Sequence, residues 1–527
     1  MKRALRILAL LAAASTLFFS RHGAAQGEAT SLRAIEDAIT ELDLERARNL
    51  LENLHTTSLG SSYERARLAV YSGDCETARI ILDAPNFGES QEAKALSELA
   101  RTCTGATAGG LIVEDHARGL WVRLQDEADR PLVPYLSNVA DAARAAIARD
   151  LGVQLPRPLR IDLVRDLFSL SAVTGLPLNA AETTGTVAVA RWGRVTMLSP
   201  RATPLGYPWQ DTLAHEITHL ALSRATRDRA PLWLQEGIAK REETRWRPPR
   251  SFDDTSADHV ARTALKSGRS IGIDKLGPSI ALLPTPEAAS IAFAEVTSFM
   301  QFWINENGAP ALALLLNDLK GLGDEAADPA LRSVTGYDLS AWIQRWKRHL
   351  VASEDPKPRE ARPTPRQPKA KGAQFGDEAD ATRRLRLSDL LFGRGHAPAA
   401  AREIEPVADA IHDEPSVCWR AARALVLSGR AEDAKRRLGK LEDMKGPYGP
   451  WFGLSERFAR EAGDTEAANR SFALGQALDP LAEEVGCEGR VTLPGTPPGN
   501  ELPADPVRRA LCAASRDVAA QKAKARE

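Results

Sequence analysis

Two histidines and a glutamate occupy one short segment of the sequence. Residues 211–219 read D-T-L-A-H-E-I-T-H, which contains His215, Glu216 and His219. On a helix, positions i and i+4 lie one turn apart on the same face, so each histidine can direct a ring nitrogen at one metal ion. Glu216 is rotated by about 100° from His215 and can act as a general base on a water molecule. The spacing therefore predicts a hydrolytic site with one Zn²⁺ per chain.

A helix with two surface histidines would have the same spacing, so the neighbouring sequence has to decide. The helical pattern continues without Pro or Gly from Trp209 to Arg227, and a second helix predicted after Pro231 contains Glu236. Catalytic zinc typically keeps three protein ligands and one open position, and two histidines with one glutamate are a standard set. We therefore predict Glu236 as the third metal ligand.

The two motifs together resemble a known group of enzymes. H-E-I-T-H at residues 215–219, followed by W-L-Q-E-G-I-A at residues 233–239, is similar to the gluzincin metallopeptidases, which include thermolysin-like and aminopeptidase-like branches. The resemblance is closest to bacterial peptidase-MA-like domains and covers most of residues 110–350. It implies zinc bound by the two histidines and the second-motif glutamate, with peptide hydrolysis through a water activated by Glu216.

The resemblance also implies a donor for the oxyanion that forms during hydrolysis. Relatives often use a Tyr or a His, but Phe293 lies about where they tend to carry a Tyr. His259 and Tyr207 are the remaining candidates. If neither reaches the metal, activity is expected to be low or absent.

Histidines that bind zinc usually donate their second N–H group to a carboxylate or a carbonyl. Asp211 lies one helical turn before His215, and Glu243 lies two turns after Glu236. Both carboxylates are therefore candidates to orient the metal ligands, and a solvated helix charge is the alternative for each.

The sequence around the motifs predicts an α+β domain over residues 109–350. Apolar periodicity and turn residues predict the following elements: a helix at 136–151, a strand at 159–164, and a hairpin of strands 186–190 and 195–199 turning at Gly193. In gluzincins an edge strand beside the zinc helix pairs with the substrate backbone. Residues 186–190 could hold a peptide in this way, or only face a core.

Helical segments are predicted on both sides of this domain, at residues 29–107 and 381–488. The pattern of Gly429, Ala434 and Leu438 returns 34 residues later as Gly463, Ala468 and Phe472. This spacing resembles tetratricopeptide repeats and implies a possible protein partner, whereas a plain helical cover for the neighbouring domain is the alternative. Residues 351–380, rich in Pro, Lys and Arg, predict an extended linker, and residues 489–527 a tail with a charged helix.

The first 25 residues have the layout of a secretory signal peptide. Lys2, Arg3 and Arg6 precede an apolar run at residues 7–19, and small residues follow. The run is shorter than the roughly 20 residues that span a bilayer, so we expect cleavage, with an uncleaved anchor as the alternative. The protein is thus predicted to be exported, periplasmic or secreted, without a stable membrane span after cleavage.

Composition limits the remaining possibilities. A chain of 527 residues allows several domains, and a formal net charge of -1 makes nucleic acid an unlikely partner class. Five cysteines leave one unpaired within a monomer. We predict two disulfides that each close a terminal segment, Cys75–Cys103 and Cys487–Cys512, and a buried packing role for Cys418.

The sequence thus predicts a predominantly helical α+β protein, with a gluzincin-like domain and a small mixed sheet flanked by helical repeats. The leading hypothesis is an exported zinc-dependent endo- or aminopeptidase that acts on peptides or proteins. Two alternatives remain: a catalytically inactive peptidase-like domain in a protein-binding scaffold, and a zinc hydrolase with another substrate on the same fold.

Overall fold

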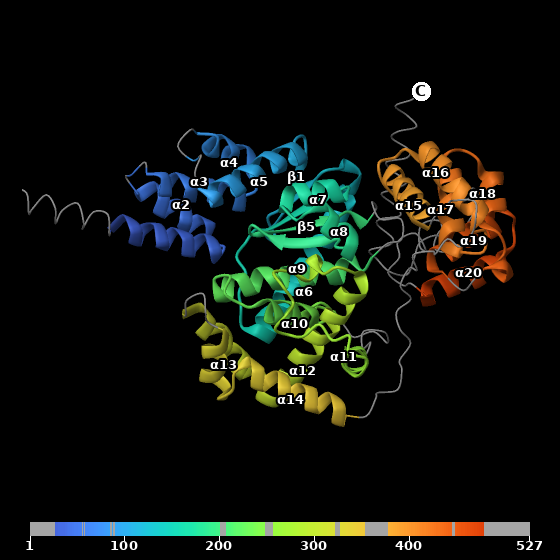
Figure 1. Ribbon diagram of the computed structural model, residues 1–527. Helices are drawn as coiled ribbons and strands as arrows, with labels where there is room; N and C mark the ends of the chain where they lie inside the picture. Colours follow the sequence, from blue (N-terminus) through green and yellow to red (C-terminus); the bar gives the residue numbers. More distant parts are fainter. Residues whose placement is uncertain are drawn as a thin grey trace, which may run out of the picture.

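The computed structural model describes residues 27–54, 56, 58–84, 87, 90–200, 207–247, 257–321, 327–353, 378–444 and 448–478. The predicted signal peptide, most of the predicted linker, and Cys487 and Cys512 lie outside these residues. The described part contains N-terminal helices, a central α+β domain and a C-terminal group of helices (Figure 1). The predicted fold class, mostly helical with a small mixed sheet, is confirmed.

A five-stranded mixed sheet lies at the centre of the middle domain, in the order β1-β2-β3-β5-β4. Its strands are β1 (Leu111–Asp115), β2 (Leu120–Leu124), β3 (Leu159–Val164), β4 (Ala188–Arg191) and β5 (Arg194–Leu198). The three central strands are parallel, and each edge strand is antiparallel to its neighbour. Central strands buried on both faces read as apolar runs. The strand predicted at 159–164 is the buried β3, whereas neither the half-exposed β1 nor the buried β2 was predicted.

The helices of the middle domain surround this sheet and each other. They are α6 (Val133–Leu151), α7 (Leu167–Thr174), α8 (Leu178–Thr184), α9 (Trp209–Thr226), α10 (Leu232–Glu242), α11 (Ala257–Lys266), α12 (Pro286–Gly321), α13 (Ala327–Thr335) and α14 (Leu339–Ala352). Helix α9 packs on β4 and β5 on one side and on α10 on the other (Figure 1). It is therefore held on both sides, with Leu213, Ile217 and Leu220 buried. Across the described residues, no helix combines the length and apolarity that a membrane span requires.

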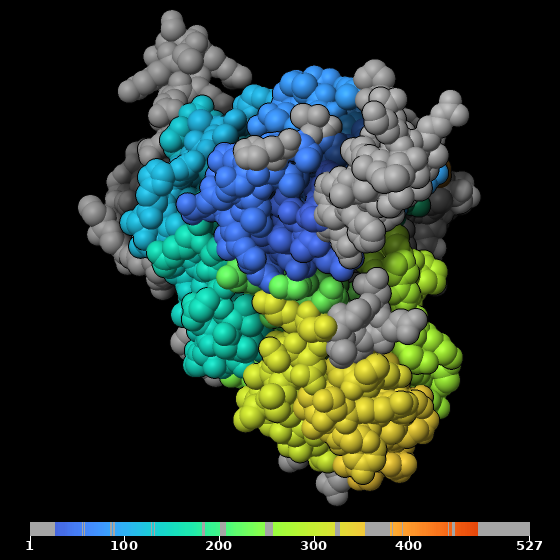
Figure 2. Space-filling view, turned by 90° about the vertical axis from the view of Figure 1, so that its left-hand side faces the viewer, coloured from blue at the N-terminus to red at the C-terminus, as the bar shows by residue number. Residues whose placement is uncertain are grey.

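The N-terminal helices share a hydrophobic core with the middle domain. They are residues 27–40, α2 (Leu44–Asn53), α3 (Leu59–Tyr71), α4 (Cys75–Leu82) and α5 (Gln91–Thr107). Ile35 and Ile39 belong to the same buried cluster as Leu213 of α9. Glu41 accepts a hydrogen bond from Arg227 at 2.7 Å. In Figure 2 these helices cover the upper part of one face and lie against the middle domain, as a cover would.

A buried cluster of charges fixes this cover to the sheet. The carboxylate of Asp162 on β3 accepts hydrogen bonds from Arg123 at 2.8 and 3.0 Å. Arg123 also donates to the carbonyl of Gly73, and the fully buried Arg194 donates to the carbonyl of Val70. Each arginine therefore joins a strand of the sheet to the backbone of the N-terminal helices. Because a buried guanidinium needs its partners, this arrangement fixes the relative position of the two layers.

A disulfide joins Cys75 to Cys103, the N-terminal pair predicted from the sequence, across a sequence separation of 28 residues. Replacing both cysteines by Ala is expected to lower the free energy of unfolding by about 3–4 kcal/mol, because the bond restricts the unfolded chain. Urea unfolding, followed by circular dichroism, measures this loss. Cys418→Ala is the control, since Cys418 is a buried free thiol in the C-terminal helices. An unchanged midpoint in the double variant would show that the disulfide contributes little.

The C-terminal helices form successive hairpins: α15 (Glu378–Gly393), α16 (Ala397–Ala410), α17 (Pro415–Leu427), α18 (Ala431–Leu438), α19 (Gly449–Glu461) and α20 (Thr465–Leu478). Gly429 and Gly463, 34 residues apart, have φ of 76° and 79° at the turns before α18 and α20. Ala434 and Ala468 are both fully buried at the equivalent positions. The sequence period thus corresponds to a repeated hairpin, while its assignment to the tetratricopeptide family stays a prediction.

Candidate metal centre

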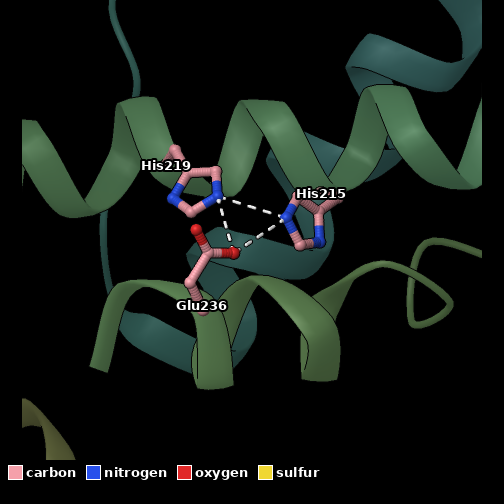
Figure 3. A group of neighbouring side chains, drawn as sticks. All are labelled: His215, His219 and Glu236. Atoms are coloured by element: carbon pink, nitrogen blue, oxygen red, sulfur yellow. Dashed lines mark hydrogen bonds and ion pairs between the residues drawn. The ribbon is translucent and has the colours of Figure 1, made fainter. Parts of the chain in front are cut away.

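Three side chains from two helices converge on one point between α9 and α10 (Figure 3). The Nε2 atoms of His215 and His219 are 3.2 Å apart. The Oε2 atom of Glu236 lies 3.5 Å from the first nitrogen and 3.6 Å from the second. The three residues that the sequence predicted as metal ligands therefore form one compact group of donor atoms.

The packing of α10 explains how Glu236 reaches the histidines. After α9 ends at Thr226, Arg227 and Asp228 adopt left-handed conformations with φ of 53° and 60°, which reverses the chain before α10. Gly237 then allows α10 to approach α12 closely. A Cβ atom at this position would lie 2.1 Å from Cγ of Met300, which is far too close. Gly237 of the second motif therefore helps to hold the neighbouring Glu236 beside the histidines.

Each histidine is oriented by a second hydrogen bond. Nδ1 of His215 lies 3.2 Å from Oε2 of Glu243, and Nδ1 of His219 lies 3.1 Å from Oε1 of Gln235. Since both partners are acceptors, the Nδ1 atoms carry the protons and the Nε2 lone pairs face the carboxylate of Glu236. Two lone pairs and a carboxylate oxygen that face one another favour a positive charge between them, which a proton or a metal cation can supply. Two imidazoles and one carboxylate are a donor set that suits zinc.

The structure separates the two carboxylates that were predicted to orient the histidines. Glu243 lies within hydrogen-bond distance of His215, as predicted. The prediction for Asp211 is wrong. Asp211 accepts hydrogen bonds from Trp246 at 2.9 Å and from Arg247 at 2.8 and 2.6 Å. Both of its carboxylate oxygens are thus engaged by Arg247 and Trp246 rather than by a metal-facing histidine.

The sequence prediction named only carboxylates as partners of the histidines and therefore missed Gln235. A neutral amide oxygen can also accept the Nδ1–H group of a histidine. The available signal was its place directly before Glu236 in the second motif. Gln235 therefore belongs to the candidate site.

Glu216 lies buried beside the ligands, with 8% of its surface exposed. Burial raises the pKa of its carboxyl group, and the neighbouring His219 and His215 oppose this rise. A backbone hydrogen bond from Ala190 of β4 also favours the ionised form and lowers the pKa. This contact places the carboxylate between the histidines and the edge strand of the sheet. A carboxylate in this position can accept a proton from a water molecule near the metal ligands.

The histidines and carboxylates of the centre shift one another's pKa values. Burial alone would lower the pKa of His215, but hydrogen bonds to Glu236 and Glu243 raise it to about 9. Burial would raise the pKa of Glu236, yet His219 and His215 hold it far below its usual range. These carboxylates thus favour positive charge at the histidines, and a metal cation would supply that charge in place of protons.

The predictions of Tyr207 and His259 as oxyanion donors stay predictions, and the structure shows their surroundings. The hydroxyl of Tyr207 donates its proton to the backbone carbonyl of Leu198, at the end of β5. His259 is an exposed residue of α11. At the third position considered, the ring of Phe293 has no donor, and Nζ of Lys240 lies 5.3 Å from its centroid.

Glu242, next to Glu243, is expected to make stability depend on pH. Burial raises the pKa of Glu242 to about 7, with Asp150 adding to the rise and Arg241 opposing it. A folded-state pKa above the unfolded value of about 4.3 means that stability falls as pH rises from about 4 to about 7. Glu242→Gln should remove roughly 2–3 kcal/mol of this decline between pH 5 and pH 8. Urea unfolding at both pH values checks this, and an equal decline in both proteins would contradict it.

Comparison with known proteins supports a peptidase domain in this part of the chain. A family model described as the Peptidase MA superfamily matches residues 139–352. This range begins inside α6, ends at the last residue of α14 and includes the whole candidate metal centre. No curated protein and no solved structure matches the chain. The match supports a gluzincin-like peptidase domain, and the helices on either side lie outside it.

Proposed function

We propose that the protein is an exported, zinc-dependent metallopeptidase. The observation that carries this proposal is the convergence of His215, His219 and Glu236 with their donor atoms no more than 3.6 Å apart. The family match over residues 139–352 supports the peptidase part of the proposal. Export rests on the signal-peptide pattern of the sequence, and the buried disulfide fits an oxidising compartment.

The residues around the centre have distinct roles in the proposed reaction. A zinc ion held by the three ligands would supply Lewis acidity, which makes a water molecule more acidic and polarises the scissile carbonyl. Glu216 accepts the proton of the attacking water and then delivers it to the leaving amine. Glu243 and Gln235 keep the two histidines in the tautomer whose Nε2 atoms face the metal.

The position of β4 supports an extended peptide as substrate. Strand β4 is at the end of the sheet order, so one of its sides has no strand partner among the described residues. Its residue Ala190 contacts the carboxylate of Glu216 through its backbone. A peptide added to this edge by strand pairing would therefore lie next to the general base.

A catalytically inactive scaffold is the second candidate. It is favoured by the hydroxyl of Tyr207, which is bound to a backbone carbonyl, and by the apolar ring at Phe293. The C-terminal hairpins would then recruit a partner while the metal centre is structural. This candidate predicts bound zinc without peptide hydrolysis.

Metal analysis of the purified mature protein, together with a quenched-fluorescence peptide library, tests the proposal. One zinc per chain and cleavage that a chelator abolishes are the expected results. Zinc without cleavage would favour the scaffold. Absence of zinc after purification in zinc-containing buffer would contradict the metal assignment.

A further inference from the structure

Lys240 lies next to the metal centre without belonging to its predicted ligands. It follows Glu236 by one turn of α10 and precedes Glu243 by three positions, so all three side chains share one face of the helix. Its Nζ donates a hydrogen bond to Oε2 of Glu243 at 2.8 Å. The same oxygen atom lies 3.2 Å from Nδ1 of His215. Glu243 is thus shared between a lysine and a metal-facing histidine.

The charge of the site explains why this contact matters. Three carboxylates, those of Glu216, Glu236 and Glu243, lie at or beside the ligands. With neutral histidines and a divalent cation, the site would still have one excess negative charge. Lys240 supplies the positive charge that removes this excess. Glu243, with 24% of its side chain exposed, gains a fixed ammonium partner and stays in place as the acceptor for His215.

The surroundings of Lys240 restrict where its ammonium group can lie. Its Nζ is 5.3 Å from the ring centroid of Phe293 on α12, within the range of a cation–π contact. The side chain is only 30% exposed. The lysine therefore has two contacts, one aromatic and one ionic, that hold it against Glu243.

We propose that Lys240 is a positioning residue, which fixes Glu243 so that Glu243 orients His215 toward the metal ion. This inference rests on the proposed zinc site and adds a chain of three residues, Lys240 to Glu243 to His215, to it. Partners that bond directly to a metal ligand, as Glu243 does to His215, typically contribute 10- to 100-fold to metal affinity, so the loss of Lys240 behind Glu243 is expected at the lower end of this range. We expect Lys240 to act on zinc binding and to leave the chemical step largely unchanged.

The test is the zinc affinity of Lys240→Met, measured by competition with a chromophoric chelator. The variant should bind zinc about tenfold more weakly than the wild type. Lys240→Arg should restore most of the affinity, because a guanidinium can also donate to Glu243. Lys435→Met is the matched control: Lys435 pairs with Glu432 on α18, three positions away and 3.0 Å apart. This control should bind zinc like the wild type.

Kinetics at saturating zinc separate positioning from catalysis. A positioning role predicts that kcat of Lys240→Met recovers to within about threefold of the wild type once zinc is saturating. Wild-type zinc affinity in Lys240→Met would overturn the proposal. A large loss of kcat at full zinc occupancy would also overturn it, because Lys240 would then act on the substrate.

A measurement without metal distinguishes this inference from the zinc proposal. In metal-free protein labelled with ¹⁵N-histidine, Lys240→Met should shift the Nδ1 resonance of His215. The Nδ1 resonance of His219, which contacts Gln235, should stay in place and serves as the internal control. A wild type that binds no zinc would contradict the metallopeptidase proposal. An unshifted His215 resonance would contradict the role of Lys240, whatever the metal content.

Discussion

Replacement of Glu216 by Gln is expected to lower kcat for peptide hydrolysis by about a thousandfold while one zinc per chain stays bound. Gln has the shape of Glu but cannot accept the proton of the attacking water. Glu216 is not among the three converging donor atoms, so the metal ligands remain complete in this variant. Loss of catalysis with retained metal is therefore the specific expectation for a general base.

Parallel measurements of zinc content and peptide cleavage on the same preparation check this prediction. Glu114→Gln is the control, because Glu114 is an exposed residue of the edge strand β1. Cleavage by Glu216→Gln at the wild-type rate would remove Glu216 from the mechanism. Loss of zinc from the variant would instead show that Glu216 helps to hold the metal.

The core of the site could be predicted because helix geometry alone determines it. His215 and His219 share a face at any point of a regular helix, and α9 spans both without interruption. Glu236 required more than spacing, since its position depends on the turn after Thr226 and on the close packing at Gly237. The resemblance of the second motif supplied that information.

The partners of these residues could not be predicted in the same way. Asp211 and Glu243 were equivalent candidates in the sequence, because both are acidic and close to a ligand. The structure separates them by direction: Asp211 points to Arg247, whereas Glu243 points to His215. Such choices depend on which side chains neighbouring segments bring near, and local periodicity contains no information about them.

The N-terminal helices illustrate the same limit at a larger scale. Their periodicity predicted helices, but not the core that they share with the middle domain. That core depends on contacts across long sequence separations, such as Arg194 with the carbonyl of Val70. The turn of the β4–β5 hairpin also lies against this layer, where a Cβ atom at Gly193 would be 2.7 Å from the ring of Tyr71. The N-terminal helices thus support the hairpin that contains β4, the strand beside Glu216.

The second large effect is expected from His219→Ala, which should weaken zinc binding by roughly a thousandfold. A protein zinc site contributes roughly 10–16 kcal/mol of binding free energy, and three protein ligands share it. Removal of one imidazole leaves His215 and Glu236, too few for a stable catalytic site. Peptide hydrolysis should disappear with the metal. Chelator competition and metal analysis after dialysis measure the change.

The matched control is His116→Ala. His116 has 86% of its side chain exposed and lies in the β1–β2 turn, away from α9 and α10. It should retain one zinc per chain and full activity, since among the described residues its imidazole lies at the surface next to Glu114, 3.3 Å away. Full zinc occupancy in His219→Ala would mean that the ion is held elsewhere. Gln235 would also lose its histidine partner in His219→Ala, which could disturb the fold. The unfolding midpoint of the metal-free variant must therefore be normal before the loss of zinc affinity is attributed to the missing ligand.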